Sequence, residues 1–264
     1  MISTRRYRTV EFWIGFILIG FLLIASILSN VIAPFPLGSM DSQSLLAPSS
    51  THLFGTDGLG RDVFSECLYA TKRTLIVGCL VAAFSGIMGI VLGSVAGVYG
   101  KIIDTILTEI MNFFTIIPSI FIILMVAVSI ELTTISFVIV LSFSFWTATA
   151  RIMRSQVKKT LCEPYIDALF KMGVSRINIV ILHIVPNSIK PVIANIALSV
   201  ASACMLESGL SFIGVCGEKI SLGQMINHGQ KYILSAWWIT LYPAAIILLI
   251  CISVLLISDA ISNH

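Results

Sequence analysis

Residues 74–99 read TLIVGCLVAAFSGIMGIVLGSVAGVY, a long run without a single charged side chain. A helix needs about 20 apolar residues to cross about 30 Å of hydrocarbon. Hydrophobic residues make up 57% of the 264-residue chain and charged residues 11%, whereas soluble domains carry about 25% charged residues. The chain therefore has too little polar surface for a soluble protein, and this run is predicted to span a membrane.

Five further apolar stretches have a similar length, so the sequence predicts an all-α membrane protein with six transmembrane helices. The additional spans are Phe12–Ala33, Ile106–Ile130, Leu132–Ala150, Pro191–Val215 and Leu234–Ile257. The apolar core of the first is longer than that of a cleaved signal peptide, so we expect it to be retained. The expected organisation is a tail (1–11), a first transmembrane helix (12–33), an extracytoplasmic segment (34–73) and a five-helix core (74–260).

The placement of Lys and Arg predicts the orientation. With a cytoplasmic N-terminus, eleven of the sixteen basic residues face the cytoplasm, and five face outward: Arg61, Lys72, Arg73, Lys219 and Lys231. Cytoplasmic loops carry the excess of Lys and Arg, so both termini are expected on the cytoplasmic side of the membrane. The net charge of +3 reflects this asymmetry, and no basic stripe interleaved with aromatic residues points to nucleic acid.

A row of small residues lies on one face of the second predicted span. Gly89, Gly93 and Gly97 are spaced four residues apart, which lets two helix backbones approach closely in lipid. We expect this face to pack against another helix, within the chain or in a partner. Pro118 interrupts the third span, and such breaks are tolerated only beside protein or a cavity, so this kink is a candidate pathway lining.

Two carboxylates interrupt apolar stretches, and an acid within the bilayer by default faces the bundle interior or water. Glu109 follows Asp104 by only one to two helical turns and is expected to reach the membrane interface. Glu207 lies deeper in its span. Two interpretations of Glu207 stay open: a residue of a substrate pathway, or a hydrogen-bonded packing residue near the outer surface.

The cysteines and histidines do not form a recognisable metal site. The chain has six Cys and four His, with neither C-x-x-C nor metal-ligand spacing. Cys67 and Cys216 are both expected outside, so one disulfide is conceivable, but free cysteines packed as small hydrophobes are favoured. We expect this chain to bind no metal.

A polar stretch, ARIMRSQVKKTLCEPYIDALFKMGVSRINIVILHIVPN, occupies residues 150–187 between the fourth and fifth spans. Glu163-Pro164 indicates a helix start, because Pro suits the first turn and an acid interacts favourably with the helix dipole. A short helix is predicted over Tyr165–Met172, with Gly173 as its left-handed stop.

A second short helix, Arg176–His183, is predicted after Ser175 as its N-cap, and Pro186 and Pro191 are expected to end it and begin the fifth span. The two helices would make a compact knob. Apolar residues expected on its surface suit a groove in another protein: Tyr165, Leu169, Phe170 and Met172.

This stretch resembles the EAA loop of binding-protein-dependent ABC importer permeases, whose pattern is Glu-Ala-Ala, three residues, Gly and a downstream Ile-x-Pro. Here the positions read Asp167-Ala168-Leu169, Gly173 and Ile184-Val185-Pro186, so Asp replaces Glu and Leu replaces the second Ala. Residues 54–65, 206–214 and 236–243 resemble signatures of the dipeptide, oligopeptide and nickel permeases, of the second-permease type.

The resemblance implies a type I ABC importer permease fold with a cytoplasmic coupling helix in an EAA loop at residues 151–190. It implies four partner subunits beside the lipid bilayer of a bacterial plasma (inner) membrane: a second homologous permease, two ABC ATPases, and an extracytoplasmic binding protein. The chain lacks a G-x-x-x-x-G-K-[ST] phosphate loop, so it is not expected to be an enzyme, and ATP and Mg²⁺ are expected in the partner ATPases.

The resemblance also nominates individual residues. Candidates for ATPase coupling are Glu163, Tyr165, Asp167, Ala168, Leu169, Phe170, Gly173 and Pro186. Candidates for the pathway are Asn112, which stands where an Asp is expected, Pro118 and Glu207. Glu207 matches an acid common in the family, which weakens the case for a substrate-specific role.

The segment Gly55–Ser65 has two interpretations of its own. Its glycines and acids suit a tight turn held by a pair between Arg61 and an Asp, which we favour because Gly and Asp at this density usually serve backbone geometry. The alternative is that the segment contacts the docked binding protein.

Short peptides are the expected cargo, because the spans hold no cluster of His, Cys or Met for a bare metal ion. Nickel, or a nickel–chelator complex, stays an alternative. The rival from another class is a secondary transporter, which is expected to carry more membrane-embedded ion sites and usually more spans.

Overall fold

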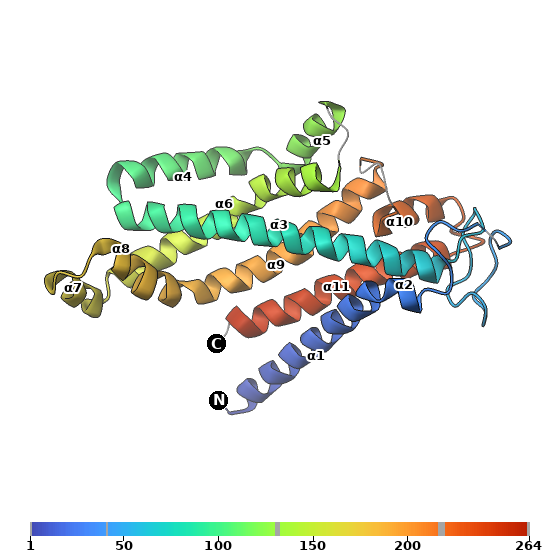
Figure 1. The fold of residues 1–264 in the computed structure, drawn as a ribbon, viewed down its shortest axis with the longest axis horizontal. Coiled ribbons are helices and arrows are strands. Elements are labelled where there is room, and N and C mark those ends of the chain that lie inside the picture. Colours follow the sequence, from blue (N-terminus) through green and yellow to red (C-terminus); the bar gives the residue numbers. More distant parts are fainter. Residues whose placement is uncertain (1, 41, 130–132, 216–219, 263–264) are drawn as a thin grey trace.

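The computed structural model describes residues 2–40, 42–129, 133–215 and 220–262, and its long helices lie along one axis (Figure 1). Neighbouring long helices pack side by side. They are α1 (Ile2–Ile27), α3 (Val63–Tyr99), α6 (Thr134–Leu161), α9 (Val185–Phe212) and α11 (Trp238–Ser262). Shorter elements connect them: α2 (Ser29–Ile32), α4 (Lys101–Ile116), α5 (Ser119–Ser129), α7 (Pro164–Lys171), α8 (Arg176–Ile179), a π-helical turn (Val180–Ile184) and α10 (Leu222–Gln230).

The helices account for the expected six spans. Five are long and apolar enough to cross a bilayer, with α8, the π-helical turn and α9 counting as one. The sixth is the pair α4 and α5, which is bent by 72° at Pro118. The all-α, six-span prediction is therefore confirmed when the bent pair counts as one broken span, and the third span is not the single helix Ile106–Ile130.

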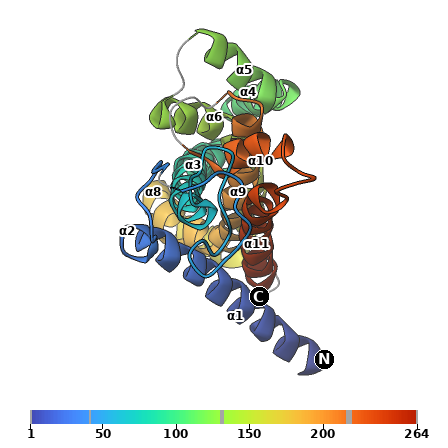
Figure 2. The same cartoon turned by 90° about the vertical axis from the view of Figure 1, so that its right-hand side faces the viewer.

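The two ends of the bundle differ in structure. Helices α7 and α8 project at one end, and the chain termini lie toward that end (Figure 1). Helix α10 and the loops between α2 and α3 gather at the opposite end, where Figure 2 shows them in front of the bundle. Below, the first is called the α7 end and the second the loop end.

Helix α3 occupies the centre of the bundle because its glycines allow two neighbours to approach. A Cβ atom at Gly93 would lie 2.5 Å from the carbonyl oxygen of Ala150 in α6, and one at Gly89 would lie 2.5 Å from the Thr149 Cβ. Gly97 likewise faces α6 at Val157, and Gly78 faces Cys204 of α9. The small-residue face thus packs within the chain.

Helix α3 begins at Val63, eleven residues before the predicted start at Thr74. The Asp62 side chain caps it by accepting a hydrogen bond from the Ser65 amide at 2.8 Å. Val63 and Ala70 are fully buried at the loop end. Tertiary packing therefore keeps a stretch helical that hydropathy assigns to the extracytoplasmic segment.

Helix α6 similarly continues to Leu161, through residues that were expected to form part of the loop after Ala150. Met153 and Val157 on its inner face are fully buried. On its other side, Arg154 and Lys158 both pair with Asp104 of α4, the Lys158 Nζ at 2.6 Å. The extension is an amphipathic helix, which a hydropathy window does not detect.

Contrary to the expectation, Pro186 and Pro191 do not interrupt the helix that leads into the fifth span. In the π-helical turn, the Val185 amide donates a hydrogen bond to the Val180 carbonyl. Pro186 lies in the first turn of α9, where a missing N–H costs little. Pro191 lies inside α9. The expected second helix is therefore α8, which ends at Ile179 and runs on through the turn into α9.

Helix α10 was not predicted. The Ser221 hydroxyl caps it by accepting a hydrogen bond from the Gln224 amide at 3.1 Å. A Cβ atom at Gly223 would lie 1.9 Å from the Ser208 carbonyl oxygen, and one at Gly229 would lie 2.4 Å from the Thr240 hydroxyl. Two glycines thus let this short helix press against α9 and α11.

The glycine contact predicts a stability loss. Gly93→Ala should lower the free energy of unfolding by about 1–3 kcal/mol, because the added methyl group meets backbone and not a movable side-chain end. Gly20→Ala is the matched control, since nothing lies within 4 Å of a Cβ atom there. Thermal melting of the two purified variants measures the difference, and equal melting temperatures would contradict the prediction.

Candidate functional site

Helix α7 is anchored to the bundle by one face only. Its Ile166 side chain is fully buried in a cluster with Met153, Val157, Ile179 and Ile184. This cluster joins α6, α7, α8 and the π-helical turn into one packed unit at the α7 end. The knob is therefore a fixed projection and not a loosely tethered loop.

Both ends of α7 are defined by backbone chemistry. Pro164 occupies the first turn and Glu163 precedes it as the N-cap residue, without a side-chain capping bond. At the other end, Gly173 has φ +79°, its amide bonds to the Phe170 carbonyl, and the Val174 amide bonds to the Leu169 carbonyl at 3.2 Å. This pair of bonds is the Schellman motif, which favours Gly at the left-handed position.

The outer face of α7 presents large apolar side chains. Tyr165 is 41% exposed, Phe170 is 40% exposed and Met172, just beyond the helix, is 68% exposed. Glu163 and Ala168 are exposed too. Leu169 differs from the expectation, because it is half-buried against the inner cluster.

Asp167 and Tyr165 of the knob have polar partners within the chain. Asp167 pairs with Lys171, one turn on, at 2.7 Å, and both side chains are largely exposed. The Asn187 amide donates to the Tyr165 hydroxyl at 2.7 Å, next to the exposed Pro186. These contacts orient Tyr165 and leave Asp167 accessible to further contacts.

Arg176 connects the knob to the central helix. Its guanidinium donates to the carbonyl of Val98 at the end of α3 and lies 5.2 Å from the centre of the Tyr99 ring. A cation over an aromatic face is a favourable contact. Arg176 thus ties the knob to the end of α3, while the separate Asp104 pairs tie α4 to α6.

Among the pathway candidates, Asn112 lies on α4 beside Arg151 of α6. The Arg151 guanidinium donates to the Asn112 side-chain oxygen at 3.1 Å and to the Thr115 hydroxyl at 3.0 Å. Pro118 is exposed at the bend, and Glu109 is exposed on α4. The bent helix pair thus presents Pro118 and Glu109 at the surface of this chain.

Glu207 lies in the interior between α9 and α3, with no exposed surface. Its carboxylate accepts hydrogen bonds from the hydroxyls of Thr74 at 2.9 Å, Ser211 at 3.2 Å and Ser208 at 3.4 Å. Buried polar groups are expected to be hydrogen-bonded, and this one is. The geometry fits the packing interpretation of Glu207.

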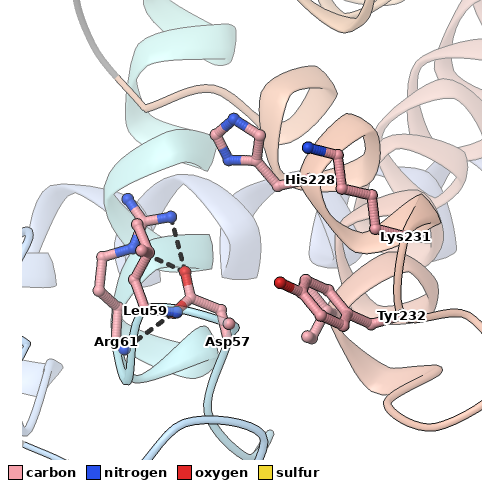
Figure 3. A pocket seen from close by; sticks show the side chains of 8 residues that line it. Asp57, Leu59, Arg61, His228, Lys231 and Tyr232 are labelled. Atoms are coloured by element: carbon pink, nitrogen blue, oxygen red, sulfur yellow. Dashed lines mark hydrogen bonds and ion pairs between the residues drawn. The ribbon is translucent and has the colours of Figure 1, made fainter.

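At the loop end, the Gly-rich segment forms the expected turn around Asp57 (Figure 3). The carboxylate accepts from the amides of Leu59 and Arg61 at 2.8 and 2.9 Å, and from the Arg61 Nε at 2.6 Å. The expected turn, held by an Arg61–Asp57 pair, is therefore present.

Sequence reasoning did not detect what packs on this turn. Trp238 donates its indole N–H to the Thr56 carbonyl at 3.1 Å, and a Cβ atom at Gly58 would lie 2.8 Å from the Tyr232 ring. The signal available in the sequence was the spacing of the glycines in Gly55–Gly60, each of which marks a close approach.

The structure describes only one of the two cysteines of the conceivable disulfide. Cys67 is buried, and Cys216 lies outside the described residues. In the described part of the chain, His, Cys, Asp and Glu side chains do not gather in groups of three or more that would hold a metal ion.

Comparison with known proteins shows the family. Residues 89–264 match the family described as binding-protein-dependent transport system inner membrane component. The chain is 31% identical to the probable D,D-dipeptide transport system permease protein of Escherichia coli, over 94% of this chain and 84% of the relative. It is 30% identical to the dipeptide transport system permease protein of Bacillus subtilis, over 94% and 79% of the two chains.

A third relative, the oligopeptide transport system permease protein of Mycobacterium bovis, is 30% identical over 87% of this chain and 81% of its own length. The matched region contains every helix from α4 to α11, including the knob with its EAA-like spacing. The chain belongs to the binding-protein-dependent transport system inner membrane components, the permeases of ABC importers.

Proposed function

We propose that the chain is one of two permease subunits of an ATP-driven importer that carries short peptides. The observation that carries this proposal is the rigid α7 knob with its exposed aromatic side chains, in a chain that belongs to the importer permeases. The relatives named above are dipeptide or oligopeptide permeases, which favours peptides over nickel as the cargo.

Coupling through α7 has a physical basis in its contacts. An ATPase with an apolar groove would bury Tyr165 and Phe170, and aromatic side chains of this kind dominate the energetics of protein contacts. The knob is packed on α6 through Ile166 and tied to α3 through Arg176. Movement of the two ATPases would therefore displace long helices as rigid bodies, which is the basis of alternating access.

The proposed assembly contains a second permease, two ATPases that bind ATP and Mg²⁺, and an extracytoplasmic binding protein. The α7 end, with the termini, would face the cytoplasm, in keeping with the eleven-to-five distribution of Lys and Arg. The loop end would face outward. The exposed apolar side chains of α4 and α5, Phe113, Ile116, Phe121 and Met125, would meet lipid or the second permease.

The cargo is tested by transport assays on the reconstituted importer. We expect ATP-dependent accumulation of labelled dipeptides in vesicles that contain both permeases, the ATPases and the binding protein. Uptake of nickel without peptide would contradict the cargo. Uptake driven by an ion gradient without the ATPases would contradict the ABC mechanism.

A substitution on α7 tests the coupling surface. Phe170→Ala should weaken binding of the ATPases by about 2 kcal/mol, roughly 30-fold, because an aromatic anchor is removed from the contact. Ile177→Ala, on α8, is a matched control at an apolar residue that is 64% exposed. Titration of purified ATPase against the membrane-embedded permeases measures both, and equal losses would rule out a specific role for α7.

A substitution at the helix stop tests whether the shape of the knob matters. Gly173→Val should uncouple ATP hydrolysis from transport, because a β-branched residue at φ +79° costs about 1–2 kcal/mol in a left-handed conformation. Gly173→Asn should retain more coupling, since Asn tolerates this region. Nothing lies within 4 Å of a Cβ atom there, so the two variants differ in backbone preference and not in clashes. Equal peptide transport per ATP in both would refute this.

A further inference from the structure

We propose that a pocket at the loop end binds a carboxylate side chain of the extracytoplasmic binding protein. The pocket lies between the turn around Asp57 and the end of α10 (Figure 3). This inference rests on the proposed function for the identity of the partner. The existence and the charge of the pocket rest on the structure alone.

The volume of the pocket suits a single side chain and not a whole small molecule. Its volume is about 180 Å³, and it is lined by Asp57, Gly58, Leu59, Arg61, His228, Lys231, Tyr232 and Ile239. Sites for whole small molecules usually have about 300–1,000 Å³. A peptide in transit would not fit, whereas the end of an Asp or Glu side chain would.

The charges around the pocket favour an anion. The Asp57 carboxylate is already satisfied by Arg61 and by two amides, so it offers little repulsion to a second carboxylate. Lys231 and His228 are exposed on the other wall, and Lys231 has no ion-pair partner among the described residues. Among the described residues, a lysine without an ion-pair partner therefore lies at the mouth, where Figure 3 shows its ammonium group near the His228 ring.

Both walls of the pocket are held in place before any partner arrives. Tyr232 packs against Gly58 across the pocket floor, at a distance that leaves no room for a Cβ atom. The buried Trp238 is bonded to the Thr56 carbonyl, and Gly229 seats α10 on α11. A preorganised site loses less conformational entropy on binding, which favours a specific contact over a diffuse charge attraction.

The position of the pocket selects the kind of partner. It lies at the opposite end of the bundle from α7, so an importer with α7 in the cytoplasm presents the pocket to the outside. In such an importer the soluble protein that approaches from this side is the binding protein. Complementary charge at a contact surface mainly accelerates association and sets the register of docking.

The test compares charge variants of the complete importer in nanodiscs, with its cognate binding protein as the probe. Lys231→Glu should raise the Kd for the binding protein at least about tenfold at low salt, because like charges then meet at the pocket. Lys231→Arg keeps the charge and should stay within about twofold of the wild type. The wild-type Kd should rise with ionic strength, and that dependence should weaken in Lys231→Ala.

Lys72→Glu is the matched control, because Lys72 is expected on the same side of the membrane and lines a different hollow, between α3 and the start of α6. Restoration of binding to Lys231→Glu by an Asp→Lys or Glu→Lys variant of the binding protein would identify the occupant directly. Equal Kd values for Lys231→Glu and Lys72→Glu would overturn the pocket while leaving the proposed function intact. Failure of the wild-type importer to bind any binding protein would overturn both.

Discussion

The close approach of α3 to α6 and α9 is the constraint on which the rest of the structure depends. In lipid, helices gain little from the hydrophobic effect by associating, so contact between backbones must supply the attraction. Gly89, Gly93 and Gly97 bring α3 against α6, and Gly78 brings it against α9. Without these four glycines, the centre of the bundle would open by the width of a side chain.

Polar groups are placed where this central packing can satisfy them. Glu207 is acceptable in the interior because Thr74, on the adjacent α3, donates to it along with two serines on its own helix. Toward the α7 end, Asp104 joins α4 to α6 through Arg154 and Lys158. Bonds of this kind need the helices to be in register, so they specify one arrangement of the bundle more than they add to its stability.

The length of α3 allows this central helix to connect the two ends of the bundle. With 37 residues at 1.5 Å each, the helix is about 55 Å long, well beyond the hydrocarbon thickness. One end is capped by Asp62 beside the turn and pocket of the loop end. The other end carries the Val98 carbonyl, to which the α7 knob is tied through Arg176. Helix α3 therefore connects the surface proposed for the binding protein with the surface proposed for the ATPase.

Hydropathy, helix-start chemistry and the left-handed preference of Gly predicted six spans, a short helix near Tyr165–Met172 and its stop at Gly173. These are local properties, and the sequence by itself determined them because each depends on neighbouring residues along one helix or turn. The tertiary structure alone decided where α3 begins and where α6 ends, that α10 forms, that the helix runs through Pro186, and that Leu169 turns inward. It also decided the outer pocket, because Asp57 and Lys231 are far apart in the sequence and line one pocket only in the folded chain. Burial against distant segments overrides local polarity at these places, and no window along the chain contains that information.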